Sequence, residues 1–534
     1  MNILGISCGH NANVCLVRDG VLEAHYEKER HTRVKDDAGK VDELARLILA
    51  DHRLTIADID LVATSWPVWP ECGVTGELVD GQMYTSVFET STHTMQLLGR
   101  RLPALLVPHH LGHAAYAFHL SGFEDADIIA VDAGGNFTAS VIGHGTGTQV
   151  RIDHDLAPGA IGPLWSMASR DIFGDILAAG KVMGLAPYGQ PAFLDYLVAK
   201  YQVDVQGFSL PGESWTDEPF LGLVLKGRDR WRTRVAQDIA SSIQELTNRT
   251  MVHLATELRR RTRRSCLCVS GGVALNGIAN EALIKTAGYF AVYIPPAVDD
   301  RGLSIGFALH AHAESAGLRC ASVDPRFLGR SHSEESVRAA ATALGSRFEV
   351  SHIGDAGMAE AIAEELIRGR IVAVWSGRSE SGPRALGHRS ILADARRRDM
   401  AHHLNVDVKH RETFRPFAPA IHGAAAHELC EMNGLSPFML RVVPLRATGR
   451  ETYPAVSHVD GSTRPQTVVP DDAATRLLGD VISFMNARVG ASLVLNTSFN
   501  IKGQPIVESP ADAAAAFRSS PIDTLALGRW LVTR

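Results

Sequence analysis

The alternation of apolar and polar residues predicts two similar groups of strands near the start of the chain. Apolar runs at residues 2–7, 14–18 and 21–26 predict strands, followed by a helix at 41–50 and another strand at 59–64. The Asp19-Gly20 pair between two of these runs is typical of a hairpin turn. A strand followed by a hairpin recurs at 127–132, 137–143 and 148–154. The pattern therefore predicts a duplicated α/β architecture.

Two similar halves of this kind resemble an actin-like nucleotide-binding fold. Further along, apolar residues recur at steps of three and four between 235 and 258, which predicts a long packing helix. A strand at 266–269 then runs into Ser270-Gly271-Gly272, where a helix begins. Backbone N–H groups at such a helix start suit a phosphate or nucleotide, although a Gly-Gly turn also permits simple close packing.

The periodicity lapses around residues 314–333, where we place a boundary between domains 1–328 and 329–534. The second domain is expected to be α/β, with helices at 334–344, 357–368, 471–487 and 510–519. Its strands are expected at 371–375, 492–495 and, last, 524–527. The stretch 448–469 is rich in Ser, Thr, Pro, Gly and Asp, so we expect a long surface loop there.

Composition narrows the class of protein. The 534 residues exceed what one core accommodates, and 45% hydrophobic with 21% charged residues is ordinary for a soluble globular protein. The net charge of −6 argues against nucleic-acid binding. Seven cysteines without a Cys-x-x-Cys pair suggest neither a disulfide framework nor a thiolate zinc site. With no signal peptide or membrane-length apolar run, we expect a cytoplasmic protein without membrane partners.

His109 and His113 are the first candidates for chemistry. Their spacing of four places both imidazoles on one face of a helix, and Asp132 ends an apolar strand nineteen residues further on. Such a set can share one metal ion, although paired helix histidines are also common packing residues. His10, in the turn after the first strand, is a candidate general base or an ordinary turn residue.

Basic residues in Gly- and Pro-rich loops suggest a second site. Guanidinium groups bind phosphate oxygens in a forked geometry. The alternative is that these basic residues only form a solvated, charged surface. The segment Asn496–Asn500 places short hydroxyl and amide side chains at a strand end, which suit either a small ligand or a capped turn. The candidates for a polyanion site are Arg378, Arg384, Arg389, Lys409, Arg411 and Arg415.

Taken together, these blocks resemble the O-carbamoyltransferase family, which includes the tobramycin and cephamycin carbamoyltransferases and nodulation protein U. The similarity covers nearly the whole chain and keeps the order of the family's motifs. The matching segments are residues 9–10, 29–35, 109–113, 132–135, 184–189, 270–276, 300–302, 382–387, 409–412, 415–417 and 496–500.

The resemblance implies a duplicated actin-like N-terminal domain and a YrdC-like α/β C-terminal domain. It implies that ATP, with Mg²⁺, and carbamoyl phosphate give carbamoyl-adenylate in the second domain. The first domain then transfers the carbamoyl group to a hydroxyl of a small molecule, expected to be a natural product in antibiotic biosynthesis. The oligomeric state stays open, a homodimer being one option. Residues 66–83 and 160–176 are expected to form loops that wall the acceptor pocket.

Roles follow from matching positions. The family's metal ligands, expected to hold Fe²⁺, match His109, His113, Asp132 and Asp300. His10 matches the position of a base near the acceptor hydroxyl, and Lys35 that of a cation near the carbonyl. The N-terminal nucleotide would be seated by Gly134, Gly135, Asn136, Gly271, Gly272 and Asn276. ATP and carbamoyl phosphate would be bound in the second domain by Arg378, Arg384, Lys409, Arg411, Arg415, Ser498 and Asn500.

Two departures concern the acceptor. Asn11 stands where the family commonly has Asp, and His31 where it usually has an aromatic residue. Both changes are expected to alter acceptor contacts. A threonylcarbamoyl-type tRNA-modifying enzyme is the alternative function, but it should show a basic face, whereas this chain is net acidic. A non-catalytic actin-like ATP-binding protein would leave the metal-type residues and the basic loops unexplained.

Overall fold

The chain divides into two compact units, which are described separately. The computed structural model describes residues 1–65, 88–135, 138–156, 161–201, 225, 227 and 229–534. Unit 1 comprises Met1–Glu29 and Asp36–Pro325, and unit 2 comprises Arg30–Lys35 and Arg326–Arg534. The main division falls close to the expected boundary at 328/329. The assignment of Arg30–Lys35 to unit 2 was not anticipated from the sequence.

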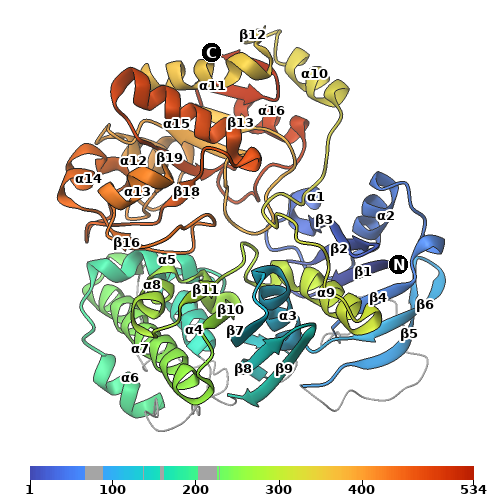
Figure 1. The fold of residues 1–534 in the computed structure, drawn as a ribbon. Coiled ribbons are helices and arrows are strands. Elements are labelled where there is room, and N and C mark those ends of the chain that lie inside the picture. Colours follow the sequence, from blue (N-terminus) through green and yellow to red (C-terminus); the bar gives the residue numbers. More distant parts are fainter. Residues whose placement is uncertain (66–87, 136–137, 157–160, 202–224, 226, 228) are drawn as a thin grey trace. The chain divides into compact units, whose positions relative to one another are not determined.

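The first sheet of unit 1 has the strand order β3-β2-β1-β4-β6-β5 (Figure 1). The strands β1 (Asn2–Ser7), β2 (Asn13–Arg18) and β3 (Val21–Glu27) form an antiparallel meander. On the other side, β4 (Leu61–Thr64) and β6 (Arg100–Leu106) continue parallel to β1, and β5 (Ser91–Leu97) closes the edge antiparallel. Buried Ile3, Leu4 and Ile6 alternate onto both faces of β1, so the sheet is covered on both sides.

The second sheet of unit 1 repeats this arrangement. It contains β7 (Asp125–Gly135), β8 (Thr138–Thr146), β9 (Gln149–Asp155), β10 (Cys266–Ser270) and β11 (Ala291–Tyr293) in the order β9-β8-β7-β10-β11. Again an antiparallel meander is followed by two strands parallel to its first member. Equal order and equal directions confirm the predicted duplication and the actin-like fold of this unit.

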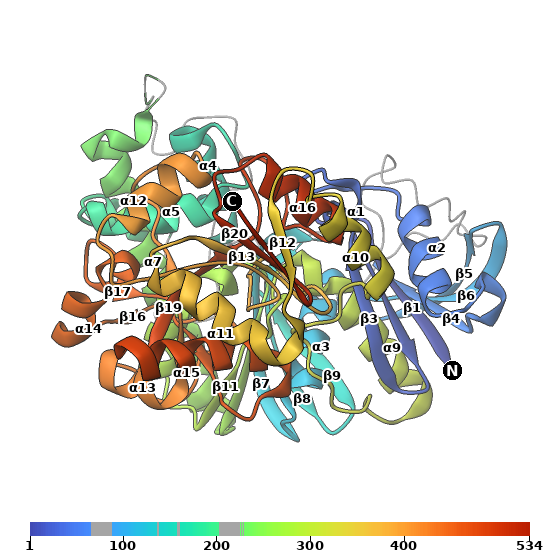
Figure 2. The same cartoon turned by 90° about the horizontal axis from the view of Figure 1, so that it is seen from above.

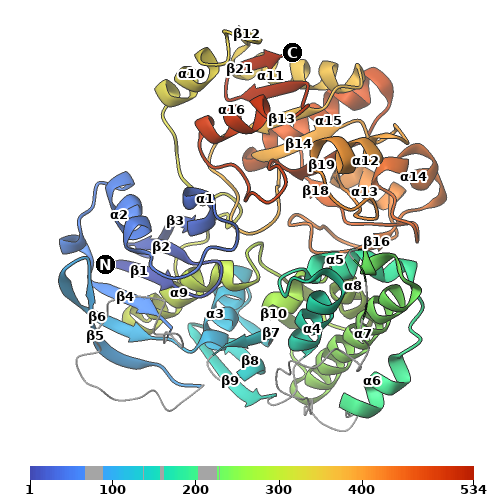
Figure 3. The same cartoon turned by 180° about the vertical axis from the view of Figure 1, so that it is seen from behind.

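Helices α3 (His109–Ser121) and α9 (Leu303–Ala316) pack closely against one another in unit 1. A Cβ on Gly306 would overlap the backbone oxygen of Gly112, and one on Gly112 would overlap the Phe307 ring. Figure 3 shows α3 beside β7 and β10. The remaining helices of unit 1 are α2 (Asp42–Asp51), α4 (Ile161–Phe173), α5 (Ala179–Leu185), α6 (Leu194–Tyr201), α7 (Arg234–Thr262) and α8 (Gly277–Thr286).

Helix α4 corrects the expectation of a pocket loop at 160–176. Leu164, Trp165, Ala168 and Ile172 are buried at helical spacing, so this segment is an amphipathic helix packed on β7. The other expected pocket loop, at 66–83, lies outside the described residues. No helix of the described part of the chain is both long and apolar enough to cross a membrane.

Unit 2 is built on a mixed eight-stranded sheet in the order β12-β21-β20-β13-β14-β19-β15-β18. Helices α11 (Gly354–Ile367) and α15 (Arg476–Val489) lie side by side (Figure 2). Helices α10 (Glu334–Thr342) and α16 (Pro510–Arg518) also pack against each other. This is the expected YrdC-like α/β domain. The strands of the eight-stranded sheet are β12 (Glu349–His352), β13 (Val372–Trp375), β14 (Arg389–Ala393), β15 (Ala418–His422), β18 (Gln466–Val468), β19 (Leu493–Ser498), β20 (Thr524–Leu527) and β21 (Trp530–Thr533).

The prediction of a surface loop at 448–469 is wrong. The segment holds the end of α14 (Ala447–Thr452), the short strand β17 (Ser462–Thr463) and β18, which pairs in parallel with β15. Gln466 is buried because its side chain bonds internally: its Nε2 donates to the Leu386 carbonyl at 2.7 Å, and its Oε1 accepts from Asn496 at 2.9 Å. Strand β21 likewise shows that 524–527 is not the last strand.

Candidate functional site

Four buried side chains converge in unit 1. Helix α3 presents His109 and His113 one turn apart, β7 presents Asp132, and Asp300 lies at the start of the turn that leads into α9. One ligand atom from each lies within 4.8 Å of all the others. His113 Nε2 is 3.0 Å from Asp132 Oδ2 and 3.3 Å from Asp300 Oδ1. All four residues that the resemblance implies as metal ligands are thus brought together.

The electrostatics of this cluster suit a cation. Burial alone would lower the pKa of His109, but Asp300 and Asp132 outweigh it and raise the pKa to about 10. Burial would raise the pKa of Asp132, yet its contacts with His109 and His113 lower it to about 2. Among the described residues, the buried Asp300 Oδ1 accepts no hydrogen bond. Two imidazoles and two carboxylates fit a divalent first-row metal.

His10 lies beside this cluster, in the turn after β1. Its Nδ1 is 3.3 Å from Asp300 Oδ2, and its side chain is half exposed. The following residue, Asn11, adopts a φ of 61° and is buried. Lys35, expected to be a cation near the carbonyl, belongs to the Arg30–Lys35 segment of unit 2, and its role stays a prediction. The structure therefore does not group the two predicted catalytic residues in one unit.

Glycines allow the backbone to approach the four-residue cluster. A Cβ on Gly135 would overlap the His109 ring, and one on Gly272 would lie 2.8 Å from Asp132 Oδ1. Gly271 adopts a φ of 86°, where other residues are strained. These contacts give the Gly-Gly turns a packing role, while their nucleotide role stays a prediction, as does that of Gly134.

The amide residues of the predicted nucleotide set behave differently. Asn276 Oδ1 accepts from the backbone N–H groups of Ile278 and Ala279 and so caps α8. Its amide also exchanges two hydrogen bonds with Gln244, at 3.0 and 3.1 Å. The side chain is thus committed to the protein itself. Asn136 lies outside the described residues.

In unit 2, Lys409, Ser498 and Asn500 come together. Lys409 Nζ donates to the Asn500 carbonyl at 3.0 Å, to Asn500 Oδ1 at 2.9 Å and to the Ser498 carbonyl. Ser498 Oγ donates to Asn500 Oδ1 at 2.8 Å. Because β19 runs through to Ser498, this part of the 496–500 segment is strand rather than a capped turn. Burial, followed by Arg411 and Arg415, holds the pKa of Lys409 well below its usual range.

Four arginines gather near Lys409. Burial and the neighbouring Arg415 lower the pKa of Arg411 to about 9. Burial holds the pKa of Arg464 well below its usual range, and Arg384, Arg411 and Arg415 add to the effect. Like charges this close favour a bound anion. Arg464 was missed because it lies in the stretch interpreted as a surface loop, where an arginine between Thr463 and Pro465 resembles any solvated one.

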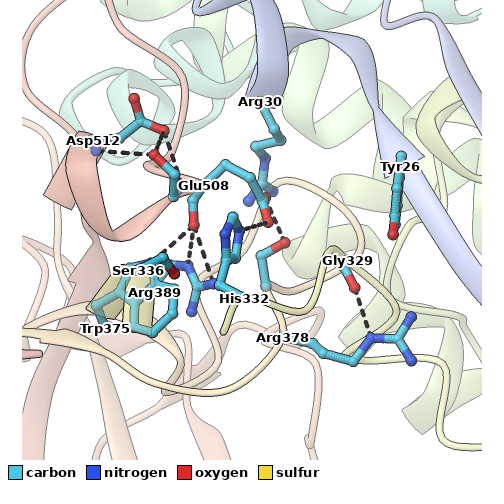
Figure 4. A network of polar contacts seen from close by, with 12 residues as sticks. Tyr26, Arg30, Gly329, His332, Ser336, Trp375, Arg378, Arg389, Glu508 and Asp512 are labelled. Carbon is cyan, nitrogen blue, oxygen red and sulfur yellow. Dashed lines mark hydrogen bonds and ion pairs between the residues drawn. The ribbon is translucent and has the colours of Figure 1, made fainter. Parts of the chain in front are cut away.

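Two other arginines of the predicted polyanion set bind the protein's own backbone. Arg378 donates to the carbonyls of Gly329 and Leu328, at 2.6 Å each. The buried Arg389 donates to the Ser376 and Glu508 carbonyls and lies 4.2 Å from the centre of the Trp375 ring. Figure 4 shows both groups. Their guanidinium groups therefore organise loops, and the phosphate contacts expected of Arg378 stay a prediction.

Glu508 was not anticipated as a structural centre of unit 2. Its carboxylate accepts from Ser379 Oγ at 2.7 Å and lies 3.5 Å from His332 Nε2 (Figure 4). Burial would raise its pKa, but His332 and Arg389 outweigh burial and lower it to about 2. Another carboxylate, Glu380, accepts three backbone N–H groups and so shapes the loop that carries Arg384.

The fold and these clusters define a two-unit protein with a metal-type cluster in an actin-like unit and a polyanion-type cluster in an α/β unit. Comparison with known families agrees with this class. The carbamoyltransferase N-terminus model matches residues 72–309, and the carbamoyltransferase C-terminus model matches residues 363–534. The chain belongs to the carbamoyltransferase family and is a carbamoyltransferase.

Individual relatives span most of the chain. Nodulation protein NolNO of Sinorhizobium fredii is 31% identical over 98% of this chain and 79% of its own length. Nodulation protein U of Rhizobium tropici is 28% identical over 98% of this chain and 94% of its own. Among solved structures, HypF of T. kodakarensis is similar at 17% identity with a TM-score of 0.32, covering 59% of this chain and 48% of its own.

Proposed function

We propose that this carbamoyltransferase uses ATP and carbamoyl phosphate to carbamoylate a hydroxyl group of a small molecule. The observation that carries the proposal is the concentration of Lys409, Arg384, Arg411, Arg415 and Arg464 in unit 2. Two phosphorylated substrates bring several negative charges, and such a site compensates them. The membership of the family supplies the carbamoyl chemistry.

The first reaction takes place in unit 2. Water and carbamoyl phosphate give carbamate and phosphate. A carbamate oxygen then attacks the α-phosphorus of ATP, and pyrophosphate leaves with its Mg²⁺, so that carbamoyl-adenylate forms. The arginines hold the phosphate oxygens and stabilise the charge that develops on them. Ser498 and Asn500, held by Lys409, orient the small carbamate group.

The transfer step takes place in unit 1. The acceptor hydroxyl oxygen attacks the carbamoyl carbon, and AMP leaves. His10 Nδ1 is 3.3 Å from Asp300 Oδ2, an orientation that leaves Nε2 to take the hydroxyl proton. A divalent cation held by His109, His113, Asp132 and Asp300 would polarise the adenylate phosphate. We infer that it is a first-row metal such as Fe²⁺ from the ligand types.

The acceptor is inferred to be a small molecule rather than a tRNA. A tRNA-modifying threonylcarbamoyl enzyme would need a positive field, and the net charge of −6 opposes one. Incubation with a panel of hydroxylated metabolites, followed by mass detection of a carbamoyl adduct, would identify the acceptor. Salt-sensitive binding of tRNA would favour the alternative.

Pyrophosphate release tests the first reaction directly. The purified protein should release pyrophosphate from ATP only when carbamoyl phosphate is present. Arg384→Met removes one phosphate contact, which typically contributes a few kcal/mol, so the rate should fall about a hundredfold. Arg397→Met is the matched control, because Arg397 is exposed and paired with Asp399. Release that is independent of carbamoyl phosphate, or equal rates in both variants, would contradict the proposal.

A further inference from the structure

A short segment of the N-terminal part of the chain is shared between the units. We call residues 27–36 the strap. Glu27 ends β3, and the short helix α1 (Lys28–Thr32) follows it. The ends of the strap belong to unit 1, whereas Arg30–Lys35 belongs to unit 2. The chain therefore passes from unit 1 to unit 2 and back within ten residues.

Arg301 holds both ends of the strap. This buried side chain directly follows Asp300 and forms an ion pair with Asp299. Its guanidinium nitrogens also lie 3.1 Å from Asp36 Oδ1, 3.7 Å from Glu27 Oε2 and 3.8 Å from Glu29 Oε1. The ends are joined to each other as well, since the Asp36 N–H donates to Glu29 Oε2 at 2.9 Å. A displacement of the Asp300 turn therefore displaces the strap ends.

The middle of the strap is held by loops of unit 2. Arg33 donates to the Ile506 carbonyl at 2.6 Å and to the Pro505 carbonyl at 2.9 Å. Arg30, drawn in Figure 4, donates to the Gly382 carbonyl at 2.8 Å. Gly382 lies two residues before Arg384, and Pro505 lies five residues after Asn500. The strap thus binds both loops that lead to the polyanion cluster.

We propose that the strap couples the two sites, with Arg301 and Arg33 as its positioning residues. Neither residue is placed among the substrates; each acts through the segment that it holds. The ends of the strap are held by one buried guanidinium in unit 1, and its middle is held by two arginines that bind loops of unit 2. A change at the Asp300 turn therefore alters the loops around Arg384 and Asn500, and a change in those loops alters the Asp300 turn. Such coupling would match the formation of the adenylate in unit 2 to its use in unit 1, and this part of the proposal rests on the proposed function.

Hydrogen exchange of the whole chain, read by mass spectrometry, tests this coupling without any ligand. Arg33→Ala should speed exchange in residues 380–388 and 503–508 of unit 2 by about tenfold, since a charge-assisted bond is lost. The coupling predicts faster exchange at 298–303 of unit 1 as well. Arg46→Ala, which removes an exposed arginine paired with Glu43 in α2, should change none of these peptides.

Faster exchange confined to unit 2 would overturn the proposal. Helix α15 serves as the internal reference, because a global loss of stability would speed its exchange too. If exchange in α15 is faster in Arg33→Ala, the milder variant Arg33→Lys replaces it, because lysine keeps the positive charge but loses the forked guanidinium. Exchange at 298–303 of unit 1 is then compared with exchange in α15 in that variant. Arg301→Lys tests the opposite direction, and exchange altered at 298–303 alone would likewise overturn the coupling. Pyrophosphate release in the wild-type protein, measured separately, shows whether the proposed function itself has failed.

Discussion

Two neighbouring buried histidines of α3 allow the metal assignment to be tested against a matched control. His113 and His110 are 0% and 1% exposed, so replacing either by Asn removes the same ring from an equally buried place. Their surroundings differ. His113 Nε2 lies 3.0 Å from Asp132 and 3.3 Å from Asp300, whereas burial and the neighbouring His109 lower the pKa of His110 to about 3. His110 is therefore a neutral packing residue.

The magnitude follows from the loss of one of four ligands. A hydrogen bond or ligand contact to a charged group is worth up to about 3 kcal/mol, which corresponds to roughly 150-fold in affinity. We expect His113→Asn to weaken Co²⁺ binding by about that factor, read by titration of the visible absorption, and His110→Asn to change it less than about threefold. Equal losses in the two variants, or unchanged binding in His113→Asn, would refute the assignment of His113 as a ligand.

Three further outcomes are expected. Arg464→Met keeps the aliphatic stem but removes one of four clustered positive charges, so it should raise the free energy of unfolding in phosphate-free buffer by about 1 kcal/mol and reduce the thermal stabilisation by pyrophosphate. Because the pKa of Glu508 is lowered to about 2, its contribution to the free energy of unfolding is complete above the unfolded pKa near 4.5 and is lost as the pH falls toward 2. The stability of Glu508→Gln should therefore depend less on pH between these two values. An unchanged pH dependence would contradict the hydrogen-bonded network around Glu508. Gly135→Ala should displace His109 and abolish tight Co²⁺ binding, whereas Gly180→Ala in α5, which meets nothing within 4 Å, should leave it intact.

The parts of the fold that could be predicted from sequence are those set by local periodicity. Strands β1, β7 and β10 are apolar runs between turn residues, and α7 shows a regular apolar stripe. The segment of α4 carried the same signal, with apolar residues at 161, 164, 165, 168 and 172, but its interpretation as a loop overlooked it. The polar stretch 448–469 carried no such signal, because Gln466 is buried through hydrogen bonds to residues distant in sequence.

The candidate site shows the same limit. Spacing on one helix is enough to place His109 and His113 together, since i and i+4 share a face. The partnership of Asp300 with them depends on the packing of α9 against α3, and it came only from the resemblance. Arg378 and Arg384 are indistinguishable in sequence, yet backbone carbonyls occupy the first. The sequence pattern does not show which groups an arginine binds, because tertiary contacts such as those of Arg378 decide it.

The cluster of unit 1 buries two carboxylates and the cluster of unit 2 gathers several cationic side chains, so each is stabilised by a ligand of opposite charge. In unit 1, Asp132 and Asp300 are both buried, and the protonated imidazole of His109 offsets part of their charge until a cation replaces that proton. In unit 2, burial and then neighbouring arginines lower the pKa of Arg411 and Arg464, a cost that a bound anion would offset. Each cluster therefore costs folding free energy when empty and regains it from its ligand. A cation should consequently raise the stability of unit 1 and pyrophosphate that of unit 2, so the response of each unit to its own ligand reports where that ligand binds.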